Sequence, residues 1–141
     1  MVLSPGILSE AVSKLEGKPS AGGICFPEKS VGEGLFVRIR DFERSFYRGT
    51  SVESARFFRK SDVVSVGGFE EGLIFFEESL LPQKIEHFLG LDCRASVASF
   101  VFHQEGKMAL RQWLKKKYYY GKSLGEYRKK VGEIGIPETG K

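Results

Sequence analysis

The stretch from residue 55 to 82 constrains the fold more than any other part of the sequence. It begins with Arg56–Lys60, where charged residues alternate with paired aromatic residues, as in a short strand. Gly67–Gly68 comes next, and because glycine permits backbone angles that other residues avoid, we predict a turn there. Glu77–Glu78 then opens a run with helical apolar spacing. The predicted order is therefore strand, glycine turn and acidic helix start.

Four short motifs succeed one another along the chain, with a fifth downstream. They are Arg56-Phe57-Phe58-Arg59, Gly67-Gly68-Phe69-Glu70-Glu71, Glu77-Glu78 and Val101-Phe102-His103, and then Tyr120-Gly121. In this order and spacing they resemble glycosyltransferase family 2, whose catalytic domain has the GT-A fold. The resemblance covers most of the chain and implies an α/β fold. Residues 1–106 would be the C-terminal half of a GT-A domain, and residues 107–141 a basic, aromatic helical tail.

The resemblance also implies a reaction, the inverting transfer of a sugar from a nucleotide sugar to an acceptor hydroxyl. The acceptor loses a proton as it attacks, so a carboxylate base must lie within hydrogen-bond reach. By resemblance Glu78 is this catalytic base, and Glu77 orients it. The family usually carries Asp at this place and again two residues on, where this chain has Glu78 and Leu80. A plain capping role for the two carboxylates at the helix start is the alternative.

Other motif residues receive binding roles from the same resemblance. The residues expected at the substrate are Arg56, Gly67, Gly68, Phe69 and Glu70. His103, at the end of a predicted strand, is the candidate metal ligand, with a structural hydrogen bond as its alternative role. The complete enzyme is expected to use Mg²⁺ or Mn²⁺ beside the leaving diphosphate.

The donor-binding part of such an enzyme is missing from the sequence. There is no Asp-x-Asp and no glycine-rich phosphate loop. Met1-Val2-Leu3-Ser4-Pro5 resembles the segment directly C-terminal to Asp-x-Asp in the family, so we expect the upstream DNA to encode that motif. A misassigned start, a split gene and a decayed gene stay open. The chain alone is expected to transfer no sugar, to hold no metal firmly, and to seek its donor half or self-associate.

Composition and cysteine usage narrow the class of protein. The 141 residues suit one domain, and 41% hydrophobic and 13% aromatic residues suit a modest core. No apolar run reaches the roughly 18 to 20 residues of a membrane span, and no secretory signal begins the chain, so we expect a cytoplasmic location. Cys25 and Cys93 form no Cys-x-x-Cys, which predicts two reduced thiols rather than a zinc site.

Charge is unevenly distributed along the chain. Residues 1–106 carry 12 basic and 15 acidic side chains, whereas residues 107–141 carry 10 basic and 3 acidic ones. Trp113 and Tyr118–Tyr120 lie among these cations, so we expect residues 107–130 to rest on an anionic membrane surface, where a lipid-linked acceptor would be found. A basic helix packed on its own domain is the alternative.

Two further functions remain open. A small nucleic-acid-binding module would use the same cations on phosphates and the aromatic rings on bases. Against it, the cations are confined to one end and Glu77–Glu78 would repel phosphate, so nucleic acid is the weaker expectation. The third possibility is a non-catalytic relic of the fold that binds only a partner.

The remaining elements are predicted from apolar spacing. Ser4–Pro5 predicts the start of a helix that ends at Gly17, with no strand before it. Part of its apolar face, and of a strand at Ala21–Phe26, would then lack cover. We predict a loop over Pro27–Gly34 and a strand over Leu91–Phe102.

Two helical regions complete the prediction. Residues 35–46 form an amphipathic surface helix with a stripe at Leu35, Ile39, Phe42 and Phe46, and by resemblance Glu43–Arg44 would line the acceptor side. The tail is predicted as two helices separated at Gly121, the second capped by Ser123, with a frayed end from Gly132.

Overall fold

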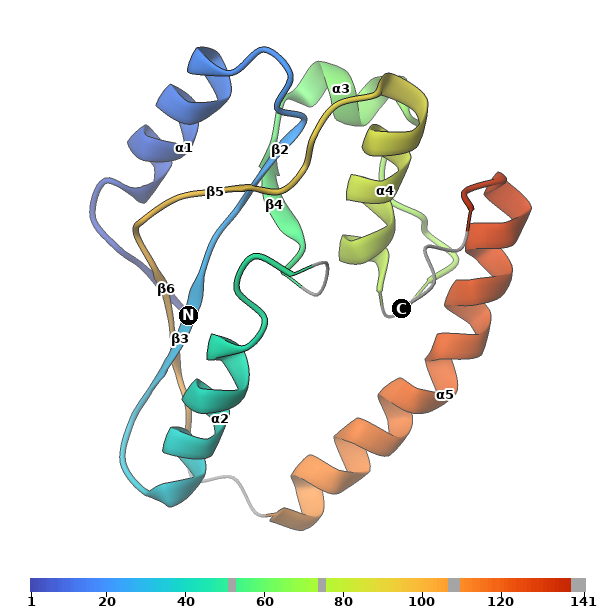
Figure 1. The fold of residues 1–141 in the computed structure, drawn as a ribbon. Helices are drawn as coiled ribbons and strands as arrows, with labels where there is room; N and C mark the ends of the chain where they lie inside the picture. The colour runs from blue at the N-terminus through green and yellow to red at the C-terminus, as the bar shows by residue number, and fades with distance from the viewer. Residues whose placement is uncertain (51–52, 74–75, 107–109, 138–141) are drawn as a thin grey trace.

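The computed structural model describes residues 1–50, 53–73, 76–106 and 110–137 (Figure 1). These residues form β1 (Val2–Leu3), α1 (Ile7–Gly17), β2 (Gly23–Cys25), β3 (Glu28–Val31), α2 (Leu35–Ser45), β4 (Ala55–Phe58), α3 (Lys60–Ser65), α4 (Glu77–Leu89), β5 (Ala95–Ser96), β6 (Val101–Gln104) and α5 (Leu110–Ile134). Helices and short mixed sheets together confirm the predicted α/β class.

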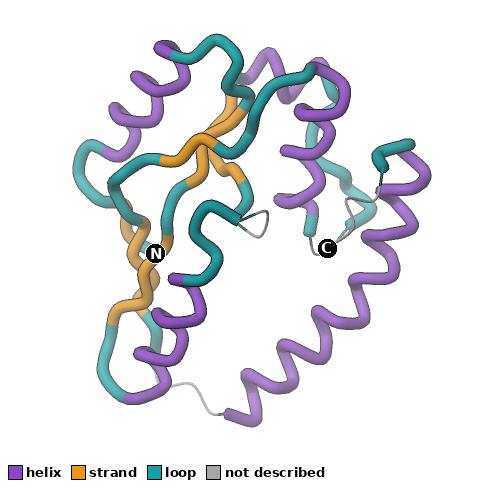
Figure 2. Tube along the Cα trace, in the orientation of Figure 1, coloured by secondary structure: helices purple, strands orange, loops and turns teal. Residues whose placement is uncertain are grey.

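The strands form two small mixed sheets. In one, β2 lies between antiparallel β4 and parallel β5. In the other, β6 lies between antiparallel β1 and parallel β3. The chain passes almost directly from β2 into β3 and from β5 into β6, so the two sheets succeed one another along the molecule (Figure 2).

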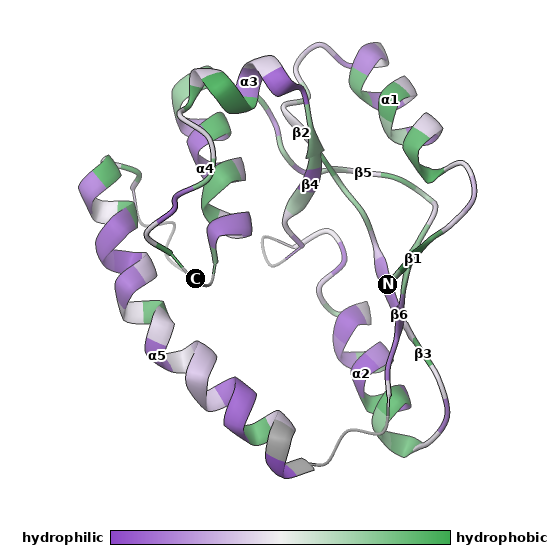
Figure 3. Cartoon of the chain, turned by 180° about the vertical axis from the view of Figure 1, so that it is seen from behind, coloured by the Kyte–Doolittle hydropathy of each residue, from purple (hydrophilic) through white to green (hydrophobic). Residues whose placement is uncertain are grey.

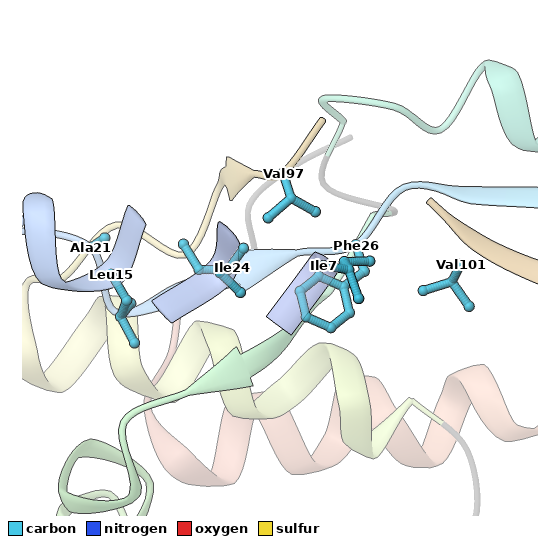
Figure 4. Packing of buried hydrophobic residues seen from close by; sticks show 8 residues of the cluster. Ile7, Leu15, Ala21, Ile24, Phe26, Val97 and Val101 are labelled. Carbon is cyan, nitrogen blue, oxygen red and sulfur yellow. The ribbon is translucent and has the colours of Figure 1, made fainter. Parts of the chain in front are cut away.

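Helix α1 covers the first hydrophobic core. Ile7, Ala11 and Leu15 recur every four residues, so they share one face of the helix, and all three are buried. They pack with Ala21, Ile24, Phe26, Val97 and Val101 (Figure 4). The segment Ala21–Phe26 is therefore buried, so the expectation that part of it lacks cover is wrong. On α1 the expectation holds in part, because Leu8 and Val12 are exposed.

The N-terminal segment also differs from its prediction, because a strand does precede α1. Val2 pairs with Phe102 and Leu3 with Val101. Ser4 does not cap the helix: its hydroxyl donates to the Phe100 carbonyl at 2.5 Å and accepts from the Phe100 N–H at 3.1 Å. These bonds tie the first residues to the segment before β6.

Two more clusters hold α4 and α5. Leu81 and Ile85 of α4 pack with Cys25, Ala55 and Cys93 over the β4-β2-β5 sheet. This approach requires glycine at position 22, where a Cβ would lie 2.6 Å from Ile85 Cγ2. On another side of α4, Leu80 packs with Val131 and Ile136 from the end of α5.

The predicted loop at Pro27–Gly34 contains β3. Apolar and polar residues do not alternate in β3, because polar side chains of other elements pack against it. The Ser30 N–H donates a hydrogen bond to Asp41, and the Ser30 hydroxyl donates one to Glu105. The predicted strand at Leu91–Phe102 is divided into β5 and β6. Between them, the N–H groups of Ala98 and Ser99 donate to the Glu10 carboxylate on α1, which takes this segment out of the sheet.

The central stretch agrees closely with its prediction. β4 ends at Phe58, two residues before the predicted end, because Lys60 already begins α3. Gly67 and Gly68 have φ of 81° and 72°, which confirms the glycine turn. Helix α4 begins at Glu77 and ends before Gly90, as predicted.

Helix α5 is continuous, so the predicted break at Gly121 and the cap at Ser123 are wrong. Ser123 lies within the helix and donates to the Tyr119 carbonyl. The helix ends in a Schellman motif: Gly135 has φ of 78° and donates to the Gly132 carbonyl, and the Ile136 N–H donates to Val131. Ile136 is buried, so the described part of the predicted frayed end is ordered; residues 138–141 lie outside the described residues.

Candidate functional site

A cavity of about 400 Å³ opens where α2, α5 and the ends of several strands meet. Its lining residues are Glu28, Arg40, Glu43, Arg44, Tyr47, Arg56, Glu78, His103, Trp113, Lys116, Lys117 and Tyr120. They come from β3, α2 and the turn after it, β4, α4, β6 and α5. Most are charged or aromatic, so the cavity can bind a ligand that carries both polar groups and a flat apolar face.

Glu28 organises the strand side of the cavity. The parallel pairing of β3 with β6 sets Glu28 beside Val101 and brings His103 near it. The His103 Nε2 lies 3.2 Å from the Glu28 carboxylate, the Arg56 guanidinium 3.0 Å and the Arg44 Nε 3.6 Å. One carboxylate therefore gathers three nitrogen-bearing side chains from different elements.

Glu43 organises the helix side. Its carboxylate accepts hydrogen bonds from Arg40 and Lys117 at 2.7 Å and from the Tyr47 hydroxyl at 2.8 Å. Burial works against the charged form, but these three donors outweigh it and lower the pKa of Glu43 to about 2. Burial and the bond to Glu43 raise the pKa of Tyr47. Lys117 belongs to α5, so this carboxylate also connects the two helices.

Several buried polar atoms on the cavity residues lack a hydrogen-bond partner among the described residues. They are Glu28 Oε1, Arg40 Nε, Arg44 Nη1, His103 Nε2 and Trp113 Nε1. The contacts of Arg56 and His103 with Glu28 are close but lack hydrogen-bond geometry at these atoms. Buried polar groups are nearly always satisfied, so a cluster of unsatisfied ones indicates a polar ligand or water in the cavity.

The structure brings together three residues that separate sequence motifs singled out. Arg56, Glu78 and His103 all line the cavity. Glu43–Arg44, expected on the acceptor side, line it as well. Glu78 is exposed, whereas Glu77 is half-buried, does not line the cavity and has an Oε2 without a hydrogen-bond partner among the described residues.

The glycine-turn residues lie outside this cavity. The Gly68 carbonyl accepts a hydrogen bond from the buried Lys84 ammonium at 2.9 Å, and Glu70 pairs with Lys130 of α5 at 3.0 Å. Phe69 is exposed. Gly67, like Gly68, does not appear among the lining residues. In this structure the turn positions α4 and α5, and these two helices bring Glu78 and the lysines to the cavity.

Sequence reasoning missed Glu28, Arg40 and Tyr47, and it placed Trp113, Lys116 and Lys117 on a membrane surface rather than at this cavity. Glu28 fell in a predicted loop, and Arg40 lay on a predicted surface helix without a role at the site. A signal was present, because Arg40 and Arg44 lie four residues apart and so share a helical face. A charged stripe of this kind can face a polar site as well as solvent.

The residues present do not fit a metal ion by themselves. Within the described ranges, no group of three or more His, Cys, Asp or Glu side chains is placed to hold one. His103 lies beside Glu28, and two arginines already occupy that carboxylate. The described residues around His103 therefore do not form a metal site.

Thiol chemistry is also absent from this site. Cys25 and Cys93 are free and buried in the second core cluster, as the sequence predicted for reduced thiols. Burial raises the pKa of each thiol to about 12, so neither provides a thiolate nucleophile near neutral pH.

Comparisons of this chain with protein-family models, curated proteins and solved structures find no significant match. Function must therefore be inferred from the cavity and its residues.

Proposed function

We propose that this chain is the acceptor-side half of a family 2 glycosyltransferase with a partial GT-A domain. One observation carries the proposal: Arg56, Glu78 and His103 come from three motifs that are far apart in the sequence, yet they line one cavity. Each motif is short, and nothing in one motif requires it to lie near the others in the folded chain.

The cavity's groups suit the chemistry of glycosyl transfer. Glu78 is the general base, because its exposed carboxylate at the start of α4 can reach an acceptor hydroxyl that enters the cavity. The Arg56, Lys116 and Lys117 cations offset negative charge on an acceptor or on a departing diphosphate. Trp113 and Tyr120 offer ring faces to a sugar or another apolar group.

The remaining machinery belongs to a partner. A donor-binding half with Asp-x-Asp would supply the nucleotide-sugar site and hold the Mg²⁺ or Mn²⁺ of the complete enzyme. The chain alone should therefore transfer no sugar when it is incubated with nucleotide sugars and Mn²⁺. Turnover above a heat-inactivated control would show that the chain is not half of an enzyme.

Acceptor binding provides the direct test. A short prenyl phosphate and a set of methyl glycosides serve as acceptor probes, with isothermal titration calorimetry as the measurement. We expect at least one probe to bind, and Arg56→Ala to weaken that binding about tenfold, because a charge-assisted contact is lost. Arg94→Ala, which removes an exposed cation elsewhere, is the matched control. Equal losses in both variants, or no binding by any probe, would contradict the proposal.

The role of Glu78 is separable from binding. In a complete enzyme that contains this chain, Glu78→Gln should lower the transfer rate by about 10²-fold or more while acceptor affinity changes little. Glu77→Gln should have the smaller effect, because Glu77 does not line the cavity. A larger loss in Glu77→Gln would reverse the assignment.

A nucleic-acid-binding module is the second candidate, favoured by exposed Tyr118 and Tyr119 among the cations of α5. It predicts binding of single-stranded DNA that weakens steeply with salt. Such binding should not respond to Arg56→Ala, so the two functions can be distinguished with the same variants.

A further inference from the structure

Helix α2 exposes the apolar stripe that its sequence would be expected to bury. Leu35 is 74% exposed, Ile39 50%, Phe42 65% and Phe46, the residue after the helix, 62%. The Phe42 and Phe46 rings pack edge to face with centroids 4.7 Å apart, so they form one continuous apolar surface. Contiguous exposed apolar patches of this kind usually mark a binding surface.

The polar side of α2 faces the protein instead. Asp41 accepts a hydrogen bond from the Ser30 N–H, and Glu43 accepts from Arg40, Tyr47 and Lys117. Arg44 pairs with Glu28 and Glu105. Both acidic side chains of the helix are therefore engaged on the inner side. The exposed charged residue on the helix itself is a cation, Arg38; beyond its ends, Arg48 and Glu33 are also exposed.

The neighbouring helix adds more positive charge. Lys117 of α5 bonds to Glu43 of α2, and Trp113 contacts Phe36 edge to face, so the first half of α5 lies beside α2. Residues 110–125 contain no acidic side chain, and Figure 3 shows α5 as mostly hydrophilic. Its exposed side chains in this half include Arg111, Lys115, Tyr118 and Lys122.

We propose that α2 lies in the interface of an anionic lipid bilayer, with Phe42 and Phe46 inserted among the headgroups and the cations of α5 attracted to the surface. A helix with an apolar stripe, a charged opposite face and low overall hydrophobicity is the kind that binds in this way. No helix of the described residues is both long and apolar enough to cross a bilayer.

Charge decides between a bilayer and a second copy of the chain. Two copies that joined their α2 faces would bring Arg38 and the cations of α5 toward their own equivalents, and like charges repel. An anionic bilayer has the opposite charge, and each basic residue near its surface adds attraction within about a Debye length. The sequence analysis placed the membrane contact on the tail alone. Because Trp113 and Tyr120 of the tail line the cavity, we assign the inserted apolar residues to α2 instead.

Vesicle co-sedimentation of the full chain tests the proposal. We expect binding to phosphatidylcholine vesicles that contain phosphatidylglycerol, and much weaker binding to phosphatidylcholine alone. The double variant Phe42→Ser/Phe46→Ser should lower the partition coefficient about tenfold or more, because two inserted rings are lost. Lys115→Glu and Lys122→Glu should each lower the partition coefficient about fivefold or more, because each replaces a positive charge near the bilayer surface with a negative one.

Matched controls keep the result specific. Phe88→Ser removes a ring that is 53% exposed on α4, and Lys60→Glu reverses an exposed charge on α3; neither should change binding. Circular dichroism of each variant confirms that the fold is retained. The proposal is overturned by equal binding to both vesicle types, or by controls as damaging as the α2 variants. A dimer that Phe42→Ser/Phe46→Ser abolishes without vesicle binding, or capture of single-stranded DNA alone, would overturn it equally.

Vesicle binding does not depend on the acceptor cavity. Arg56→Ala should leave vesicle binding unchanged, and Phe42→Ser/Phe46→Ser should leave the affinity for a methyl glycoside unchanged. Failure of one proposal therefore does not imply failure of the other.

Discussion

At the scale of single residues, Glu43 combines a strong local interaction with a position between two helices. Three donors from α2, the turn after it and α5 converge on its two oxygens. A carboxylate held by several charged donors stabilises the folded state for as long as it stays ionised. Its contribution therefore depends on pH in a defined direction.

The pKa of Glu43 is lowered from 4.5 to about 2, so the stabilisation is complete above about pH 5 and is lost as the pH falls toward 2. We expect the free energy of unfolding to fall more steeply between pH 5 and pH 2 in the wild type than in Glu43→Gln. Urea denaturation followed by circular dichroism at several pH values measures it. Glu16→Gln, an exposed carboxylate on α1, is the control. Parallel profiles for the wild type and Glu43→Gln would refute the assignment.

The resemblance grouped Arg56, Glu78 and His103 at one site, and these three residues line one cavity. Gly67, Gly68, Phe69 and Glu70, which were grouped with them, lie outside it. Glu28 was not predictable in this way, because its role depends on the pairing of β3 with β6, more than 70 residues apart. The local sequence does not indicate which distant strand a polar segment will pair with. The same reason explains why β3 was expected to be a loop.

At the scale of elements, periodicity correctly located α1, α2 and α4 but did not tell which face of α2 is buried. The usual inference puts the apolar stripe inside. Here Val37 is buried, and Asp41 accepts a hydrogen bond from Ser30 of β3. Arg40 and Arg44 pair with Glu105, the residue after β6. The polar face of a helix can be the buried one when charged groups of other elements pair with it. Predicting this requires knowing which strands pack against the helix.

The surroundings of Gly121 in helix α5 lead to a testable prediction. Gly121 lies in the helix, and a Cβ there would meet no atom within 4 Å. Gly121→Ala should therefore stabilise the protein by about 0.5–1 kcal/mol, because alanine loses less backbone entropy in a helix. Thermal denaturation measures the change.

Gly22→Ala is the matched opposite case. Its Cβ would lie 2.6 Å from Ile85 and 2.7 Å from Leu91, so we expect a loss of about 1–3 kcal/mol from overpacking. If both variants shift stability in the same direction, the described surroundings of one glycine are wrong.

At the scale of the whole molecule, α5 is attached near its two ends by different means. Lys117 and Trp113 contact α2 near the first end, and Val131 and Ile136 pack on Leu80 near the last. Tyr127 adds a hydrogen bond from Gln83 between them. Since α5 provides a wall of the cavity, these attachments determine whether the cavity exists.

Leu80→Ala should therefore weaken both stability and the position of α5. Truncation of a fully buried leucine costs about 2–5 kcal/mol. Hydrogen exchange should speed up more in residues 120–134 than in α1, whose core cluster does not include Leu80. Leu8→Ala, at an exposed position of α1, is the control. Uniform acceleration in both helices would mean that α5 has no separate attachment.

Trp113 gives the molecule an optical reporter of its own cavity. It is the single tryptophan of the sequence, its indole N–H is buried without a hydrogen-bond partner among the described residues, and the Lys117 ammonium lies 5.4 Å from its ring. Excitation of this one chromophore reports the polarity and charge of the lining, free of signal from any other indole. A ligand that enters the cavity should shift or quench the emission, so unlabelled compounds can be screened by intrinsic fluorescence alone.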